Sequence, residues 1–185
     1  MRRKMKNRTL TSVTFLILIG LITMISAADK QTEQRLVEYV DIDRFMGDWY
    51  VIANIPTPFE KGAVNAIENY TWNPEKEIIE VSFDYRQDSP DGKPKHMTQK
   101  GFIYNKETNA EWRVQPIWPL KLGYLIIDLA DDYSYTVIGV PNRKYLWIMA
   151  RESSIPDDIY QAILDNVEKQ GYALDKIQKV PQIWS

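Results

Sequence analysis

Short segments in which apolar and polar residues alternate, separated by turn residues, make up most of the chain beyond residue 45. A two-residue period is typical of β-strands that bury one face. The pattern predicts eight strands, over residues 49–55, 63–72, 77–86, 97–104, 111–117, 123–129, 133–140 and 145–151. The connections at 73–76 and 89–92 contain Asn, Pro or Gly, which favour tight turns. Eight consecutive strands with short connections indicate an all-β fold, an up-and-down antiparallel barrel or a sandwich.

One segment after the last predicted strand has a helical period instead. Ile159, Ile163 and Val167 recur every four residues, which places one apolar stripe along a helix. The preceding segment 153–158, SSIPDD, offers a capping hydroxyl, a first-turn proline and two acids, and Gly171 follows as a stop. We therefore predict one C-terminal α-helix packed outside the sheet, followed by a short final strand over residues 174–180.

The first 28 residues differ in character from the rest of the chain. A basic start, with five Lys and Arg residues by position 8, precedes an apolar run of 13 residues from Val13 to Ile25 and the small residues Ser26, Ala27 and Ala28. This order predicts a signal peptide over residues 1–28 and an exported domain over 29–185. The protein would then be periplasmic or associated with the outer membrane if it is bacterial, and secreted otherwise. An uncleaved membrane anchor is the alternative.

Removal of that segment makes the chain more acidic, because it holds five of the 23 basic residues and none of the 25 acidic ones. The remaining chain has 18 basic and 25 acidic residues, a net charge of −7. This charge disfavours nucleic acid as a partner. The chain has no cysteine, so neither a disulfide nor a lipid anchor on a cysteine at the cleavage site is expected.

Residues suited to catalysis are sparse. The single histidine, His96, lies beside Lys93, Pro94 and Lys95, where we predict an exposed turn. The chain contains no cysteine nucleophile, no GxSxG segment, and no His, Cys and carboxylate cluster with the spacing of metal ligands. We therefore predict no enzymatic activity, no cofactor and no metal.

Three short segments carry a resemblance to a known family. They are GDW at residues 47–49, DDY at 131–133 and Arg151 at the end of the eighth predicted strand. In type, order and separation they resemble the signatures of the lipocalins. The longer segments GDWYVIANIP, LGYLIIDLADDYSYTVIGVP and YLWIMAR are most similar to bacterial outer-membrane lipocalins and apolipoprotein D. The resemblance extends from about residue 41 to about residue 182 and implies an eight-stranded antiparallel up-and-down lipocalin barrel.

The resemblance also implies structural roles for the signature residues Gly47, Trp49, Asp132, Tyr133 and Arg151. Gly47 would allow a tight turn beneath the barrel, and Trp49 would fill its closed end. Arg151 would stack its guanidinium on that indole. We expect these residues to stabilise the fold and not to act in catalysis.

Strand alternation, with the family as guide to register, indicates which residues line the barrel. The predicted ligand-binding residues are Trp147, Tyr124, Trp112, Val114, Ile126, Met149, Tyr70, Ser82 and Arg86. On the third strand the opposite face, which is more apolar, would line the interior if the register is shifted by one residue; it carries Ile79, Val81, Phe83 and Tyr85. This composition suits an amphiphile with its tail deep and its head group near the mouth.

The resemblance implies an extracytoplasmic lipid-binding protein whose ligand is a fatty acid or lysophospholipid, with a role in lipid storage, transport or membrane maintenance under stress. Peripheral contact with a membrane, and a monomeric or homodimeric state, are further expectations. Two alternatives stay open: a lipocalin-fold enzyme acting on a hydrophobic substrate, and a carrier of a tetrapyrrole or carotenoid.

Overall fold

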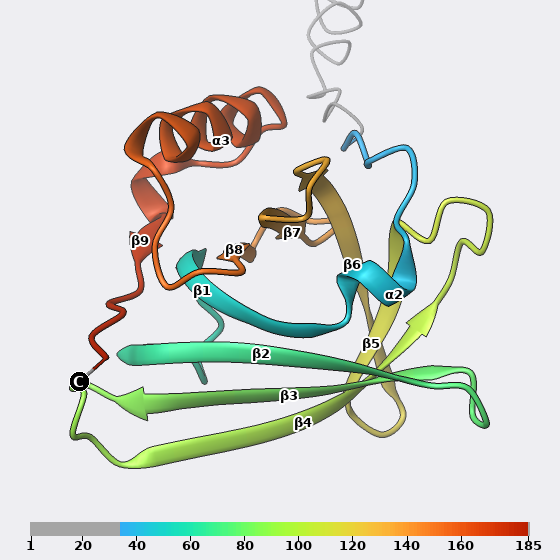
Figure 1. Ribbon diagram of the computed structural model, residues 1–185, viewed down its shortest axis with the longest axis horizontal. Helices are drawn as coiled ribbons and strands as arrows, with labels where there is room; N and C mark the ends of the chain where they lie inside the picture. The colour runs from blue at the N-terminus through green and yellow to red at the C-terminus, as the bar shows by residue number, and fades with distance from the viewer. Residues whose placement is uncertain (1–33, 185) are drawn as a thin grey trace, which may run out of the picture. The chain divides into compact units, whose positions relative to one another are not determined.

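Eight antiparallel strands form a closed barrel in the computed structural model, which describes residues 34–184 (Figure 1). The strands are β1 (Gly47–Ile55), β2 (Ala63–Asn73), β3 (Ile78–Gln87), β4 (Pro94–Ile103), β5 (Glu111–Ile117), β6 (Leu120–Leu129), β7 (Tyr135–Gly139) and β8 (Leu146–Ala150). Each strand pairs with the next, and β1 pairs with both β8 and β2, which closes the barrel. The predicted signal peptide and its cleavage site lie outside the described residues.

The two ends of the barrel differ in how they are covered. The short helix α2 (Ile42–Phe45) precedes β1 and buries Phe45 against Trp49, with ring centres 5.1 Å apart. We call this end the floor. The loops that join β1 to β2, β3 to β4, β5 to β6 and β7 to β8 lie at the opposite end, which we call the mouth.

Helix α3 (Asp157–Lys169) packs on the outside of the barrel, as predicted (Figure 1). Its buried residues Tyr160, Ile163 and Val167 belong to a hydrophobic cluster with outward-facing residues of β1, β6, β7 and β8. The predicted serine cap is wrong, because the N-cap is Pro156 and no side chain caps the helix. The helix begins at Asp157, so both serines precede the capping position.

The strand after the helix is shorter than predicted. A single turn of 3-10 helix, η2 (Leu174–Lys176), occupies the first part of the segment, where the Ile177 N–H donates to the Leu174 carbonyl. Strand β9 (Gln178–Lys179) then pairs with Ala53 and Asn54 of β1. Local 3-10 hydrogen bonding therefore replaces half of the expected sheet pairing.

β4 begins earlier than predicted and takes in the histidine. His96 lies in β4, paired across the sheet with Asp84 of β3, and not in a turn. Its Nδ1 is 2.7 Å from Asp84 Oδ1, and both side chains are exposed. The cross-strand partner stabilises an extended conformation that Lys93 and Pro94 alone did not suggest.

A bulge in β1 changes which of the two hydrophobic clusters its residues join. The pairing with β8 shifts register between Val51 and Ala53. Trp49 and Val51 therefore belong to the cluster inside the barrel, whereas Ala53 and Ile55 belong to the cluster beneath α3. The same shift turns Asn54, paired with Trp147, toward the interior.

Within residues 34–184, no helix has the length and apolar character needed to cross a membrane.

Candidate functional site

The floor of the barrel is centred on Trp49, whose side chain is fully buried. Its indole Nε1 donates to the Phe45 carbonyl at 2.8 Å. The guanidinium carbon of Arg151 lies 3.7 Å from the indole ring centre, a cation–π contact typically worth about 0.5–2 kcal/mol. Gly47 has φ of +94°, and a Cβ there would lie 3.5 Å from Arg151 Nη1. The contact with Arg151 would be an ordinary one, so the positive φ of the turn into β1 is what favours glycine here.

Arg151 also binds the chain that closes the floor. Its Nη1 donates to the Asp48 carbonyl at 2.7 Å, and its Nη2 lies 2.7–3.1 Å from the carbonyl oxygens of residues 44, 45 and 46. Charged donors make the stronger hydrogen bonds to such carbonyls. Arg151 thus holds α2 and the start of β1 together.

The segment 131–133, in the connection between β6 and β7, also binds the chain at the floor. The Tyr133 hydroxyl accepts from the Asp41 N–H at 2.7 Å, and the Arg44 guanidinium lies 4.0 Å from the Tyr133 ring centre. Asp132 accepts from the Ser134 N–H at 2.9 Å, and hydrogen bonding to Ser134 lowers the pKa of Asp132. These contacts join the β6–β7 connection to α2.

Most of the residues predicted to line the barrel lie together inside it. Six of them are buried in the inner cluster: Tyr70, Trp112, Val114, Tyr124, Ile126 and Met149. Trp147 is partly buried and packs against that cluster from the mouth side. The deepest of these rings are closely packed, since Trp112 stacks on Tyr124 with centres 5.3 Å apart and planes 10° from parallel.

The predicted inward orientation of Ser82 and Arg86 is wrong. Ser82 is half-buried and Arg86 is exposed, whereas the alternating residues Ile79, Val81, Phe83 and Tyr85 are buried in the inner cluster. The reason is the β2–β3 register, which pairs Tyr70 with Val81 and Glu68 with Phe83. Directly opposed residues share a face, so an inward Tyr70 requires an inward Val81.

A buried carboxyl group lies next to the aromatic floor. Glu68, only 5% exposed, accepts a hydrogen bond from the Tyr70 hydroxyl. The hydroxyls of Tyr70 and Tyr124 are 2.5 Å apart, so the three groups form one chain of hydrogen bonds. Burial raises the pKa of Glu68 to about 7, and it raises the pKa of both tyrosines well above their ordinary value.

A second group of polar side chains lies nearer the mouth. Glu60, in the β1–β2 loop, is buried and accepts from the Thr57 N–H at 3.1 Å and from Trp147 Nε1 at 3.2 Å. Burial raises the pKa of Glu60. Asn54 is 1% exposed, and neither its Nδ2 nor its Oδ1 has a hydrogen-bond partner in the described structure.

Sequence reasoning missed Asn54, Glu60 and Glu68. The signal for Glu68 was present, since it lies two residues before Tyr70 and must share its face in a regular strand. Asn54 was hidden by the bulge in β1, because simple alternation from Trp49 turns Asn54 outward. Glu60 is in a loop, where alternation has no meaning.

Hollows elsewhere in residues 34–184 are lined by other side chains. Three such hollows have linings that include none of Trp147, Glu68 and Asn54. Residues 34–184 include no group of three or more His, Cys, Asp or Glu side chains able to hold a metal ion. Convergent polar groups in an apolar enclosure are typical of small-molecule sites.

A closed eight-stranded barrel with an apolar interior and a few inward polar groups defines the class of barrel proteins that hold one small hydrophobic ligand. A family model described as "Lipocalin-like domain" matches residues 40–182, and the chain belongs to the lipocalin family. The family supports binding of a small hydrophobic ligand.

Relatives of known name cover most of the chain. It is 29% identical over 168 residues to temperature-induced lipocalin-1 of Arabidopsis thaliana, covering 83% of this chain and 85% of that protein. It is 27% identical over 147 residues to the outer membrane lipoprotein Blc of Escherichia coli K12, covering 80% and 82%. Apolipoprotein D of Mus musculus is 26% identical over 153 residues, covering 78% of each chain. The resemblance inferred from the three signature segments is therefore confirmed.

A solved structure supports the fold independently. Insecticyanin from the tobacco hornworm Manduca sexta superposes with a TM-score of 0.61 at 16% identity, covering 82% of this chain and 84% of that one. At this identity the likeness concerns the fold alone.

Proposed function

We propose that this lipocalin is an extracytoplasmic carrier that holds the acyl chain of a fatty acid or lysophospholipid inside its barrel, for lipid storage, transport or membrane maintenance under stress. The observation that carries the proposal is the inner cluster, in which aromatic and aliphatic side chains from β1 to β8 converge. The relative named apolipoprotein D supports a lipid as ligand.

Binding should depend on chain length. Each methylene group buried in an apolar interior contributes up to about 0.8 kcal/mol, so affinity should rise with acyl length until the barrel is full. Titration of acyl lipids of graded length, followed by tryptophan fluorescence, should show saturation at one ligand per barrel. The same affinity at every length would exclude the proposed mode of binding.

The ligand carried in the native host can be identified directly. Native mass spectrometry of the protein purified from that host should reveal an acyl lipid. A coloured tetrapyrrole or carotenoid in its place would support the carrier alternative, and a chemically altered substrate would support an enzyme.

Exposed apolar side chains at the mouth support peripheral contact with a lipid surface. Trp118 is 82% exposed and Phe59 is 73% exposed, and Ile117, Leu120 and Leu122 of the β5–β6 hairpin are also exposed. Tryptophan and phenylalanine partition well into membrane interfaces. Trp118→Ser should reduce co-sedimentation with phospholipid vesicles severalfold, while Trp184→Ser, on the outer wall beside Tyr50, should not.

We also propose export with cleavage after Ala28, giving a mature chain that begins at Asp29. The mature protein should not incorporate labelled palmitate, because it has no cysteine to acylate. N-terminal sequencing tests the cleavage site, and a full-length chain retained in membranes would contradict it. Whether the mature protein is a monomer or a homodimer can be read from its mass in solution.

A further inference from the structure

Two carboxyl groups face the interior of the barrel without a basic partner. No ion pair in the described part of the chain involves Glu60 or Glu68. Glu68 accepts its hydrogen bond from Tyr70, and Glu60 accepts from Trp147 and Thr57. An ionised carboxylate withdrawn from water is stabilised by a nearby positive charge or by further donors, and a second anion beside it is repelled. The interior therefore favours polar groups that donate.

The residues that surround Glu68 bring no positive charge to it. Trp49 of β1 and Phe83 of β3 lie opposite Glu68 in the sheet and are uncharged. Around them are the hydroxyls of Tyr70 and Tyr124, and Glu60, whose charge further disfavours ionisation of Glu68.

Two basic side chains lie at opposite ends of the barrel. Arg151 is stacked on Trp49 and donates to main-chain carbonyls of the floor. Lys95 pairs with Tyr85 at the mouth end of β4 and is half-exposed. Neither makes an ion pair with Glu60 or Glu68 in the described structure.

Asn54 adds unused hydrogen-bonding capacity to the same enclosure. Its paired residue, Trp147, packs against the inner cluster and donates to Glu60, whereas Ala53 and Ile148 on the other face belong to the cluster beneath α3. A buried amide without partners costs roughly 1–3 kcal/mol, which a ligand that bonds to it would recover. The Asn54 oxygen can accept from an amine or a hydroxyl, and its nitrogen can donate to a hydroxyl or a carboxylate, so Asn54 can bind a polar group without distinguishing among the three.

We propose that Glu68, together with Glu60, makes the barrel select amphiphiles whose polar group is an amine or a hydroxyl over the carboxylate of the same chain length. The inference rests on the proposed binding of an acyl chain in the barrel and adds the chemistry of the polar group: of the two proposed ligands it disfavours the free fatty acid, whose polar group is a carboxylate. Both carboxyl groups are buried, and Glu68 is the main specificity-determining residue because strand β2 holds it in place, whereas Glu60 lies in the β1–β2 loop.

The test compares decylamine, decanol and decanoic acid at pH 8, each below its micelle concentration, on the intact mature protein. The wild type should bind the amine and the alcohol at least about tenfold more tightly than the acid, as a difference of one charge near a buried carboxylate suggests. Glu68→Gln keeps a hydrogen-bond acceptor for Tyr70 and should bring the acid to within about threefold of the alcohol while weakening the amine.

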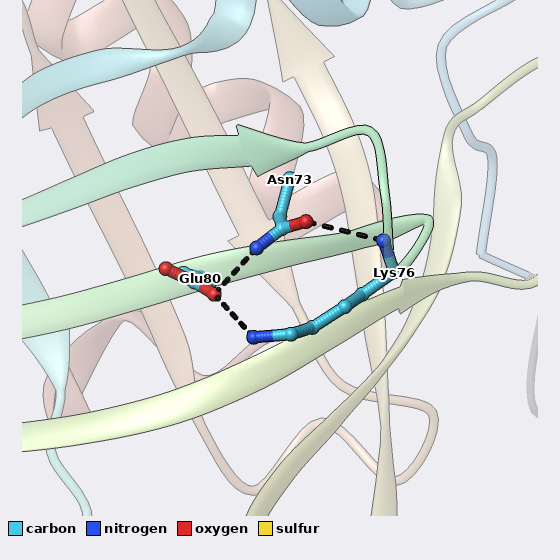
Figure 2. Close-up of polar contacts among 3 residues, drawn as sticks. All are labelled: Asn73, Lys76 and Glu80. Atoms are coloured by element: carbon cyan, nitrogen blue, oxygen red, sulfur yellow. Dashed lines mark hydrogen bonds and ion pairs between the residues drawn. The ribbon is translucent and has the colours of Figure 1, made fainter.

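Glu80→Gln is the matched control, because Glu80 lies on β3 in the same hairpin but on the outer face (Figure 2). There it accepts from Asn73 Nδ2 at 2.9 Å and lies 3.7 Å from Lys76 Nζ. This variant should keep the wild-type order of the three ligands. If Glu68→Gln does not fold, Glu60→Gln in the loop should shift the order in the same direction.

The outcomes separate this inference from the proposed function. Equal binding of the three ligands, or an order unchanged in both the Glu68 and Glu60 variants, overturns the selectivity and leaves acyl binding in place. Failure of every one of the three ligands to bind overturns the proposed function itself.

Discussion

At the floor of the barrel the buried donors are matched by main-chain carbonyls, whereas at the mouth a buried amide is left without a partner. Trp49, Trp112 and Arg151 all donate to main-chain oxygens of residues 44–48 and 109. The side-chain amide of Asn54, near the mouth, has no hydrogen-bond partner among residues 34–184. The side-chain donors at the floor therefore already have partners that close the barrel, whereas the amide of Asn54 at the mouth is available to a ligand.

Glu68 lies between these two ends and shares features of both. Its hydrogen bond to Tyr70 links it to the floor, and the pKa raised to about 7 reflects an enclosure that does not fully compensate its charge. The exposed Glu80, on the outside of the neighbouring strand, has the amide of Asn73 and the ammonium of Lys76 beside it (Figure 2). A glutamate on the inner face of the hairpin is thus buried without a positive charge beside it, whereas one on the outer face is half-exposed and lies beside a lysine.

The largest expected effect is at the floor. Trp49→Ala removes a fully buried ring and leaves Arg151 without its stacking partner, so the free energy of unfolding should fall by roughly 3–5 kcal/mol. Denaturant unfolding measures the loss. Trp184→Ala, which removes a half-exposed indole from the outer wall, is the control and should cost much less. Equal losses would mean that Trp49 does not close the barrel.

The next effect concerns the pH dependence of stability. The folded pKa of Glu68 is about 7 and the ordinary value is 4.5, so the folded state retains a proton that the unfolded state loses between these pH values. The free energy of unfolding should therefore fall by roughly 3 kcal/mol as the pH rises from 4.5 through 7, and the loss should then level off.

Comparison with Glu68→Gln isolates this contribution from those of other groups. The variant should lack that part of the slope and be more stable than the wild type above pH 7. Parallel profiles for the two proteins would show that Glu68 titrates normally.

A smaller effect is expected at the mouth. Trp147 is partly buried and donates to Glu60, so Trp147→Ala should weaken binding of an acyl ligand by about 1–3 kcal/mol. Its effect on unfolding should be smaller than that of Trp49→Ala. Isothermal titration of both variants distinguishes the two roles, and a Trp147 variant with wild-type affinity would place the ligand elsewhere.

The smallest effect is expected on the outer surface. Glu80→Gln removes an exposed ion pair with Lys76 and should change the free energy of unfolding by less than about 0.5 kcal/mol at any pH. A larger change would show that the contrast between the outer and inner carboxyl groups is overstated.

The local order of apolar and polar residues was enough to predict most of the secondary structure of this protein. Alternation and turn residues predicted the eight strands, and the four-residue spacing of Ile159, Ile163 and Val167 predicted the face of α3, of which Ile163 and Val167 are buried. Alternation also assigned Trp147 and Met149 to one face of β8. These features depend on the geometry of one element at a time, which the order of residues specifies.

Other features depended on the partner of a strand, and only the tertiary structure decided them. Either face of β3 could have been the inner one until its pairing with β2 set Val81 opposite Tyr70 and turned Arg86 outward. The bulge in β1 reversed the alternation at Asn54, and a loop brought Glu60 to Trp147. A period of two residues has two possible phases, and the choice between them is made by cross-strand hydrogen bonds to residues distant in the chain.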